Sequence, residues 1–271
     1  MAIAELTPEL TDLYCKCLED WSSEMLEAGD HKRRWFDKYS SRGLRVRLVE
    51  DERRTVAGMI HYLPIEHSLA EGKDLYFILC VWVHGHRQGR GDFQGRGMGR
   101  SLLAAAEADA RDLGAKGMAA WGLWLPFWMR ASWFRRHGYR KADRDGIRLL
   151  MWKPFTPEAE PPRWVRRRKK PAATPGQVTV TSFVNGWCPA QNIAHERARR
   201  ASSDLGDRVT FKTIDTSDRE VFLEWGISDG LFVDGKEVNT GPPPSYDKLH
   251  ELIGRRVARL RLAGRGDSFP R

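Results

Sequence analysis

The sequence predicts an α/β protein of two domains, and three observations support that prediction. The chain has 271 residues, which is more than one average domain holds. Apolar runs of strand length alternate with segments of helical periodicity. Residues 156–177 are rich in proline and basic residues and lack periodicity, which is typical of a linker. We therefore expect one domain over residues 1–155 and a smaller one over 178–271.

The first domain should hold a mixed sheet flanked by helices. A cap-and-first-turn pattern at Thr7 and Pro8 predicts a helix over residues 7–29. A polar turn between 43–50 and 55–63 predicts a hairpin. The remaining expected elements are a buried central strand over 74–83, a helix from 98 to the stop signal at Gly114, a strand over 117–122, a helix over 127–137 and a strand over 146–155.

The second domain should have the element order βαβαββα. Its strands are apolar runs bounded by polar turns, and its hairpin carries Asp234-Gly235 at the turn. In chain order the expected elements are a strand over 178–184, a helix over 189–203, a strand over 208–215, a helix over 218–225, a hairpin over 231–238 and a helix after 246.

Composition limits the classes of protein to which the chain can belong. The hydrophobic fraction is 41% and the charged fraction 30%, which is typical of a globular protein. No apolar run has the length of a membrane span, and the first residues lack the basic-then-apolar pattern of a signal peptide. Four unpatterned cysteines do not form a disulfide framework. We expect a cytoplasmic protein that binds no membrane.

The net charge of +9 comes from two short segments. Six basic residues lie in 163–170 and six arginines follow residue 254, and without both segments the chain is slightly negative. A solvated linker and tail explain this distribution, so we expect no nucleic-acid partner. Recruitment of RNA, DNA or an acidic partner by 163–170 stays open as an alternative.

A glycine-rich loop follows the predicted central strand and opens the next helix. It contains Gln94, Gly95, Arg96, Gly97, Met98 and Gly99. Glycines let the backbone approach a pyrophosphate, and the helix N-terminus adds amide groups and a positive partial charge. Arg96 and Arg100 add formal positive charge nearby. A flexible surface loop is the alternative interpretation.

This loop resembles the pyrophosphate-binding motif of GNAT acetyltransferases, with Gln94, Gly97 and Gly99 at the motif positions. The later run from Ser132 to Tyr139 resembles the family's helix that ends in Gly-aromatic, and the resemblance covers roughly residues 5–155. It implies an acyl-CoA-dependent transferase that moves an acetyl group from acetyl-CoA to an amine. It also implies a set of donor-binding residues, namely Val81, Trp82, Val83, Gln94, Gly95, Arg96, Gly97, Met98, Gly99, Arg100 and Ser101.

Proton transfer during catalysis needs a base for the amine and an acid for the leaving thiolate. Carboxylate and imidazole groups near the strand ends are the candidate bases; they are Glu66, His67, His61, His84 and His86. Many GNAT acetyltransferases have a tyrosine that serves as the general acid at the position where this chain has Phe134. His84 and His86 lack the further ligands of a metal site, so we expect no metal.

Residues 121–134 are rich in aromatic side chains. They include Trp121, Trp124, Phe127, Trp128, Trp133 and Phe134. Two interpretations stay open. The side chains form either a helix packed on the sheet or an aromatic pocket for an apolar or cationic acceptor.

The second domain carries Cys188 between a strand and a helix. The segment resembles the thioredoxin Trp-Cys-x-x-Cys site, but Gln191 replaces the second cysteine. A helix start lowers a thiol's pKa, so Cys188 is expected to be the most reactive cysteine and to serve catalysis. The domain order resembles YoaP-type acetyltransferases, and the alternative function is a thiol-dependent redox or carrier protein. A small-molecule or peptide amine is the expected partner, while the oligomeric state stays open.

Overall fold

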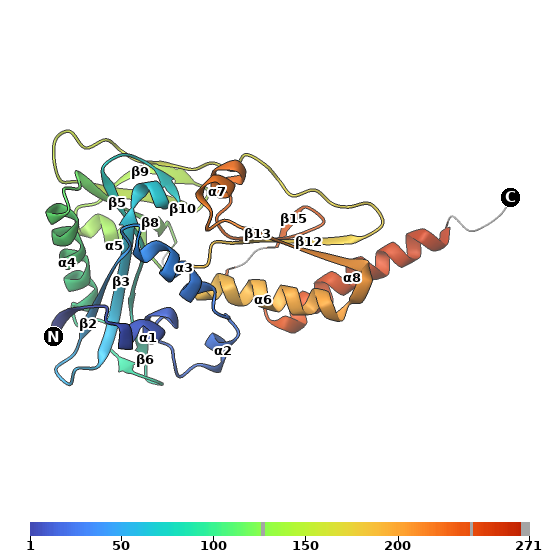
Figure 1. Ribbon diagram of the computed structural model, residues 1–271, viewed down its shortest axis with the longest axis horizontal. Coiled ribbons are helices and arrows are strands. Elements are labelled where there is room, and N and C mark those ends of the chain that lie inside the picture. Colours follow the sequence, from blue (N-terminus) through green and yellow to red (C-terminus); the bar gives the residue numbers. More distant parts are fainter. Residues whose placement is uncertain (126–127, 239–240, 267–271) are drawn as a thin grey trace. The chain divides into compact units, whose positions relative to one another are not determined.

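The computed structural model describes residues 1–125, 128–238 and 241–266. It divides into two compact units (Figure 1). The first comprises Met1–Trp21 and Phe36–Val165, and the second comprises Ser22–Trp35 and Arg166–Arg271. The second unit therefore includes a segment from the N-terminal part of the chain, which the predicted boundary at 156–177 does not anticipate.

The first unit is a seven-stranded mixed sheet in the order β1-β2-β3-β5-β8-β10-β9. All neighbours are antiparallel except β5 and β8, which are parallel. The strands of this sheet are β1 (Ala2–Glu5), β2 (Arg45–Glu50), β3 (Val56–Pro64), β5 (Leu75–Val83), β8 (Gly117–Leu123), β9 (Arg140–Asp145) and β10 (Arg148–Pro154). Short paired strands outside it are β4 (Ala70–Glu71) with β11 (Arg163–Trp164), and β6 (Gly85–His86) with β7 (Gly91–Asp92).

Two helices cover one face of this sheet, as Figure 1 shows. They are α4 (Met98–Asp112) and α5 (Ala131–Arg136). The helical period of α4 places Leu102, Leu103 and Ala106 in one buried cluster with side chains of the sheet. α4 is also tied to β2 and β3, because the Asp109 carboxylate accepts hydrogen bonds from Arg45, Arg47 and the Tyr62 hydroxyl.

The predicted hairpin, the central strand and the helix that begins at Met98 are confirmed, and the expectation of one helix over 7–29 is wrong. Residues 7–29 do not form one helix, because Cys17 and Leu18 have φ of 52° and 64°, which lie in the left-handed region. They form two short helices instead, α1 (Thr11–Cys15) and α2 (Ser23–Leu26). α3 (His31–Ser40) and β9 were not predicted. The expected helix over 127–137 is the shorter α5, and Phe127 lies outside the described residues.

The second unit has the predicted order βαβαββα. Its sheet order is β13-β12-β14-β15, with β12 and β13 parallel and the other pairs antiparallel. The elements are β12 (Val178–Val184), α6 (Pro189–Asp204), β13 (Val209–Asp215), α7 (Arg219–Trp225), β14 (Gly230–Val233), β15 (Lys236–Val238) and α8 (Tyr246–Gly266).

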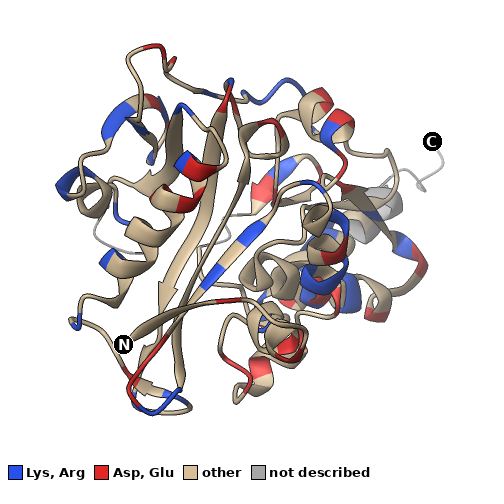
Figure 2. Cartoon of the chain, turned by 60° about the vertical axis from the view of Figure 1, so that its left-hand side comes forward, with Lys and Arg blue, Asp and Glu red and all other residues tan. Residues whose placement is uncertain are grey.

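Residues 156–177 are less free than a solvated linker would be. Trp164 and Val165 are buried, and the Trp164 amide donates to Asp143 at 2.9 Å. Further along, Arg167 and Lys169 pair with acidic side chains of the second unit, Glu237 and Glu224. Figure 2 shows basic and acidic residues interspersed along helices and loops. Part of the basic run is therefore neutralised by local ion pairs.

None of the helices in the described residues is both long enough and apolar enough to cross a bilayer.

Candidate active site

The sheet of the first unit opens between its two parallel strands. β5 pairs with β8 from Leu75 to Ile78, and the pairing ends there although both strands continue. β5 bulges at the same point, because His61 pairs with Cys80 while Tyr62 pairs with Ile78. The unpaired edges leave backbone amide and carbonyl groups available beyond the bulge.

The side chain of Trp121, on β8, contacts the bulged residue Leu79. Its indole Nε1 donates to the Leu79 carbonyl over 2.7 Å, so this carbonyl points towards β8. On the other edge of β5, the His84 amide donates to the Ala57 carbonyl at 2.9 Å, beside β3. Backbone groups alternate in direction along a strand. The amides of Val81 and Val83 therefore face the opening, and the amide of Trp82 faces β3.

The glycine-rich loop leads into α4 close to this opening. Gly97 is the N-cap of α4 with φ of 78°, and Gly95 has φ of 76°. A Cβ built on either glycine would meet no atom within 4 Å, so the backbone there is open to an incoming group. Gly99 lies between Trp133 and Val83, at 3.5 and 3.8 Å from its would-be Cβ. The loop, the end of β5 and α5 thus converge.

The first turn of α4 presents amides that have no partner inside the helix. Those of Met98, Gly99 and Arg100 belong to this turn, whereas the Ser101 amide donates back to the Gly97 carbonyl. The Arg100 side chain is exposed. Exposed cationic side chains and open amides at a helix start suit an anion.

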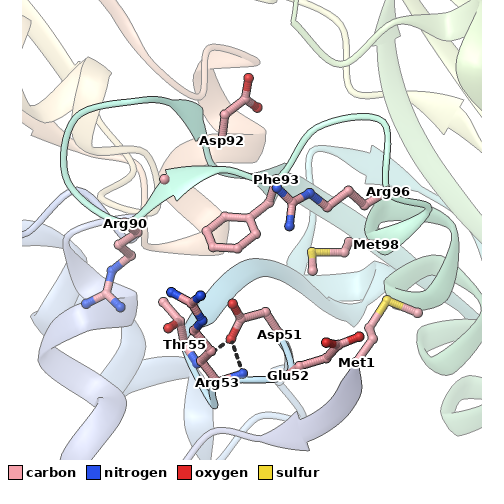
Figure 3. Close-up of a pocket in the computed structure, with 11 residues that line it drawn as sticks. Met1, Asp51, Glu52, Arg53, Thr55, Arg90, Asp92, Phe93, Arg96 and Met98 are labelled. Carbon is pink, nitrogen blue, oxygen red and sulfur yellow. Dashed lines mark hydrogen bonds between the residues drawn. The ribbon is translucent and has the colours of Figure 1, made fainter.

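Two other loop residues make local contacts. The Gln94 side chain packs over Gly85, where a Cβ would lie within 2.0 Å of Gln94 Nε2. The Arg96 guanidinium stacks on the Phe93 ring at 5.2 Å from its centroid. Figure 3 shows both Arg96 and Phe93 in the wall of an open cavity of about 630 Å³. The 51–55 turn also lines this cavity. In this turn the Asp51 carboxylate accepts hydrogen bonds from the Arg53 and Thr55 amides.

A second cavity of about 630 Å³ lies between α4 and α5. Its lining is cationic on balance and consists of Arg100, Leu103, Ala104, Glu107, Arg136, His137 and Lys153. Only Arg100 of these was predicted as a binding residue. Arg136 and His137 end the helix that precedes the Gly-Tyr pair; they lie in the motif-like run from Ser132 to Tyr139 but were not predicted as binding residues.

Residues 7–124 match the model of the acetyltransferase (GNAT) family, over a span that contains both the opening and the loop. These residues form a GNAT acetyltransferase domain. The described fold of the first unit, a mixed sheet with flanking helices, agrees with the predicted α/β class.

Several solved structures resemble the GNAT domain. A PaiA N-acetyltransferase from Thermoplasma acidophilum, solved with coenzyme A, is 14% identical over 57% of this chain and 98% of its own, with a TM-score of 0.41. A GNAT acetyltransferase from Brucella melitensis, solved with acetyl-CoA, is 17% identical over 60% and 94%, with a TM-score of 0.40. A ribosomal-protein-alanine N-acetyltransferase from the same organism is 18% identical over 57% and 100%, with a TM-score of 0.42. No curated protein matches the chain.

The predicted base candidates Glu66 and His67 lie at the wrong end of β5. They follow Pro64, which pairs with Tyr76, whereas the open edge begins after Ile78. The strand advances by five residue steps from Tyr76 to Val81, a distance of about 16 Å. The geometry therefore contradicts a direct catalytic role for Glu66 and His67.

The predicted base His84 is also unsuitable. Its side chain is fully buried, with Nδ1 2.7 Å from the Gly91 carbonyl and Nε2 3.2 Å from the donating Trp21 Nε1. Nδ1 must carry the proton that bonds the carbonyl, and Nε2 accepts the indole hydrogen. Both nitrogens are thus engaged, so His84 holds the 84–91 loop rather than moving protons.

The other two histidines differ in accessibility. His61 is buried beside the Tyr14 hydroxyl, with 2.9 Å between that oxygen and His61 Nδ1. His86 is exposed, and its ring lies 6.2 Å from Trp82 and 6.5 Å from Trp21. Of the four histidines proposed as bases, His86 is the exposed one at the end of β5.

The aromatic residues of 121–134 do not form one surface. Phe134 is buried in the core, whereas Trp124 and Trp128 are 67% and 36% exposed. Trp121 packs edge-on against Trp128, with 5.6 Å between ring centroids. Phe134 therefore agrees with the interpretation of a helix packed on the sheet, and the aromatic acceptor pocket stays a prediction.

In the second unit, Cys188 is the N-cap of α6, as predicted, but its side chain is only 4% exposed. Its carbonyl accepts from the amides of Gln191 and Asn192. The buried position limits reagent access to Cys188, which is expected to be the most reactive thiol, whereas Cys15 and Cys17 are half-buried. Cys80 is buried, as predicted.

Proposed function

We propose that the chain transfers an acetyl group from acetyl-CoA to the amine of a small-molecule or peptide substrate. The observation that carries the proposal is the end of β5–β8 pairing after Ile78, beside a helix that starts at an open, left-handed Gly97. A GNAT domain over residues 7–124 supports the same activity.

The donor would bind along the open edge and the α4 start. The amides of Met98, Gly99 and Arg100 can bind the pyrophosphate, with Gly95 and Gly97 allowing close approach. Gln94, Arg96 and Ser101 border the same loop as candidate contacts. The cavity between α4 and α5, with Arg100 and Arg136, has the charge to hold the phosphorylated nucleoside end of CoA.

The thioester carbonyl would be polarised at the opening. Backbone amides that face a developing oxyanion stabilise the tetrahedral intermediate of acyl transfer. Val81 and Val83 are the residues whose amides face this edge, so they are preferred over Trp82 among the three predicted residues. Trp82 would instead support the site through its packing on His86.

A proton must leave the attacking amine and another must reach the thiolate. Phe134 has no hydroxyl, and the Tyr139 hydroxyl is buried in the core, where burial raises its pKa well above 10. Neither residue is placed to donate. We propose His86 as the base, directly or through water, because it is the exposed imidazole at the end of β5.

The second unit is inferred to be thioredoxin-like, in a YoaP-type arrangement. The order β13-β12-β14-β15, with helices between β12, β13 and β14, supports this inference. Gln191 stands in place of a resolving cysteine and Cys188 is buried, so nothing favours a thiol redox cycle.

An acceptor screen that detects free CoA thiol tests the proposed activity. We expect acetyl-CoA binding by calorimetry, and thiol release with at least one class of amine. His86→Gln should lower kcat for acetyl transfer, while His250→Gln, a change to a histidine of the second unit, should not. Folded protein that fails to bind acetyl-CoA would overturn the proposal.

A further inference from the structure

Three potential metal ligands converge in the second unit. They are His31 at the start of α3, and His195 and Glu196 on α6. One ligand atom from each lies within 4.8 Å of the other two. His31 Nε2 is 2.8 Å from Glu196 Oε1, and His195 Nε2 is 3.8 Å from the same oxygen. The second distance is too long for a hydrogen bond.

The outer contacts of the three groups orient them towards a common point. His195 is buried, and its Nδ1 lies 2.9 Å from the Ser182 hydroxyl. When Nδ1 donates its proton to that hydroxyl, Nε2 presents its lone pair towards Glu196. Arg199 holds the other carboxylate oxygen, Glu196 Oε2, at 2.8 Å. Oε1 is thereby left on the side of the two imidazoles.

Burial also favours the form of His195 that binds metals. The buried environment disfavours the charged imidazolium form of the ring. A neutral imidazole is the common nitrogen ligand of transition metals. The side chains of His31 and Glu196 are 15% and 18% exposed, which leaves a route for an ion from solvent.

We propose that His31, His195 and Glu196 form a Zn²⁺ site, with water as the fourth ligand. Tetrahedral zinc with bonds of 2.0–2.1 Å places neighbouring ligand atoms about 3.3 Å apart. The observed separations of 2.8 and 3.8 Å lie on either side of that value. Two nitrogens, one carboxylate and one water are a ligand set that zinc accepts.

Binding requires one local change at His31. Its Nε2 proton, which bonds Glu196 in the free protein, must leave so that Nε2 can coordinate, and Nδ1 takes up a proton instead. Arg34 lies 3.1 Å from Nδ1 and must turn away; Asp30, 2.9 Å from Arg34, can hold it. Arg34 and Arg199 also repel a dication, so we expect weaker binding than at a thiolate site.

The site would join two parts of the second unit that are far apart in sequence. His31 belongs to the segment Ser22–Trp35, and the other two ligands belong to α6. Zinc would therefore stabilise this unit by linking the segment to the helix, because an ion bound only by the folded state shifts the unfolding equilibrium.

The test uses the full chain, stripped with a chelator and then titrated with Zn²⁺ by calorimetry. We expect wild type to bind one more equivalent than His31→Ala or Glu196→Ala, and Zn²⁺ to raise Tm in wild type but not in either variant. His250→Ala is the matched control, since this histidine of α8 lies outside the cluster. Co²⁺ in the same protein should give the visible absorption of a tetrahedral ion, and the two variants should lack it.

Equal stoichiometry in wild type, His31→Ala and Glu196→Ala would overturn the proposal, as would the absence of Zn²⁺ binding by wild type. Both variants change partly exposed side chains, so they are preferred to a change at the buried His195. Circular dichroism establishes that they are folded. The readouts do not involve acetyl transfer, so the result is independent of the function proposed above.

Discussion

The open helix start at Gly97 makes Gly97→Glu the sharpest test of donor binding. Gly97 has φ of 78° and no atom within 4 Å of an added Cβ, so the new side chain fits but strains the backbone. The strain in this left-handed conformation costs about 1–2 kcal/mol. The protein should remain folded, with that small loss in the free energy of unfolding.

The effect on binding should be larger, because the carboxylate would lie where a pyrophosphate is proposed. Two like charges about 4 Å apart repel by about 1 kcal/mol in water and about 4 kcal/mol near a protein surface. These energies correspond to roughly a 5-fold to 1,000-fold loss of affinity. Steric exclusion from the amides adds to it, so we expect binding of acetyl-CoA to fall at least tenfold.

Gly114 supplies the matched control at the other end of the same helix. It has φ of 81°, and a built Cβ also meets nothing within 4 Å. It lies about 25 Å from Gly97 along the helix axis. Gly114→Glu should lose similar or slightly more stability, since a negative charge at a helix C-terminus is unfavourable. Its acetyl-CoA affinity should match wild type. Calorimetric titration that finds wild-type affinity in folded Gly97→Glu would refute the reasoning.

Three further predictions concern stability and thiol access. Asp109→Asn should lower the free energy of unfolding at pH 7 by about 3 kcal/mol, because Arg45 and Arg47 lose their shared partner. Burial raises the pKa of Asp109, but hydrogen bonds from Arg45, Tyr62 and Arg47 outweigh burial and lower it from 3.8 to about 2. The difference in the free energy of unfolding between wild type and Asp109→Asn, measured in urea, should therefore shrink as pH falls from 4 to 2. A difference that stays constant over this range would contradict the assignment. The fragment 166–271 should have a lower Tm than the same fragment fused to residues 22–35, because Arg197 loses its ion pairs with Glu24 and Glu27. Equal melting temperatures would show that the segment 22–35 contributes nothing to the stability of the second unit. In pulsed alkylation read by peptide mass spectrometry, Cys15 and Cys17 should label before Cys80 and Cys188, and faster labelling of Cys188 would show that α6 opens at its start.

Local patterns predicted those parts of the fold that depend on nearby residues. The hairpin of β2 and β3 and the buried run of β5 follow from turn chemistry and apolar length. The start of α4 followed from glycines between a strand and an amphipathic run. The helix expected over 7–29 failed because periodicity carries no sign of the left-handed backbone at Cys17 and Leu18.

The candidate site was predicted less completely, since parts of it depend on tertiary pairing. The sequence places Glu66 and His67 just after a strand, but it does not reveal that Pro64 pairs with Tyr76, away from the open edge. Burial of His84 depends on the distant Trp21, and the bulge at Leu79 depends on the register with β3. The glycine loop was recognised because its motif is contiguous.

The passage of the chain between the two units has a consequence for synthesis on the ribosome. Ser22–Trp35 is made early, whereas its partners on α6 end at Asp204. At 5–20 residues per second, roughly ten to thirty seconds separate the two. During that interval Glu24, Glu27 and His31 lack Arg197 and Glu196, the residues of α6 with which they pair in the finished protein. The nascent chain thus carries this largely charged segment without its native ion pairs, and the segment can dock on its own unit only after α6 emerges.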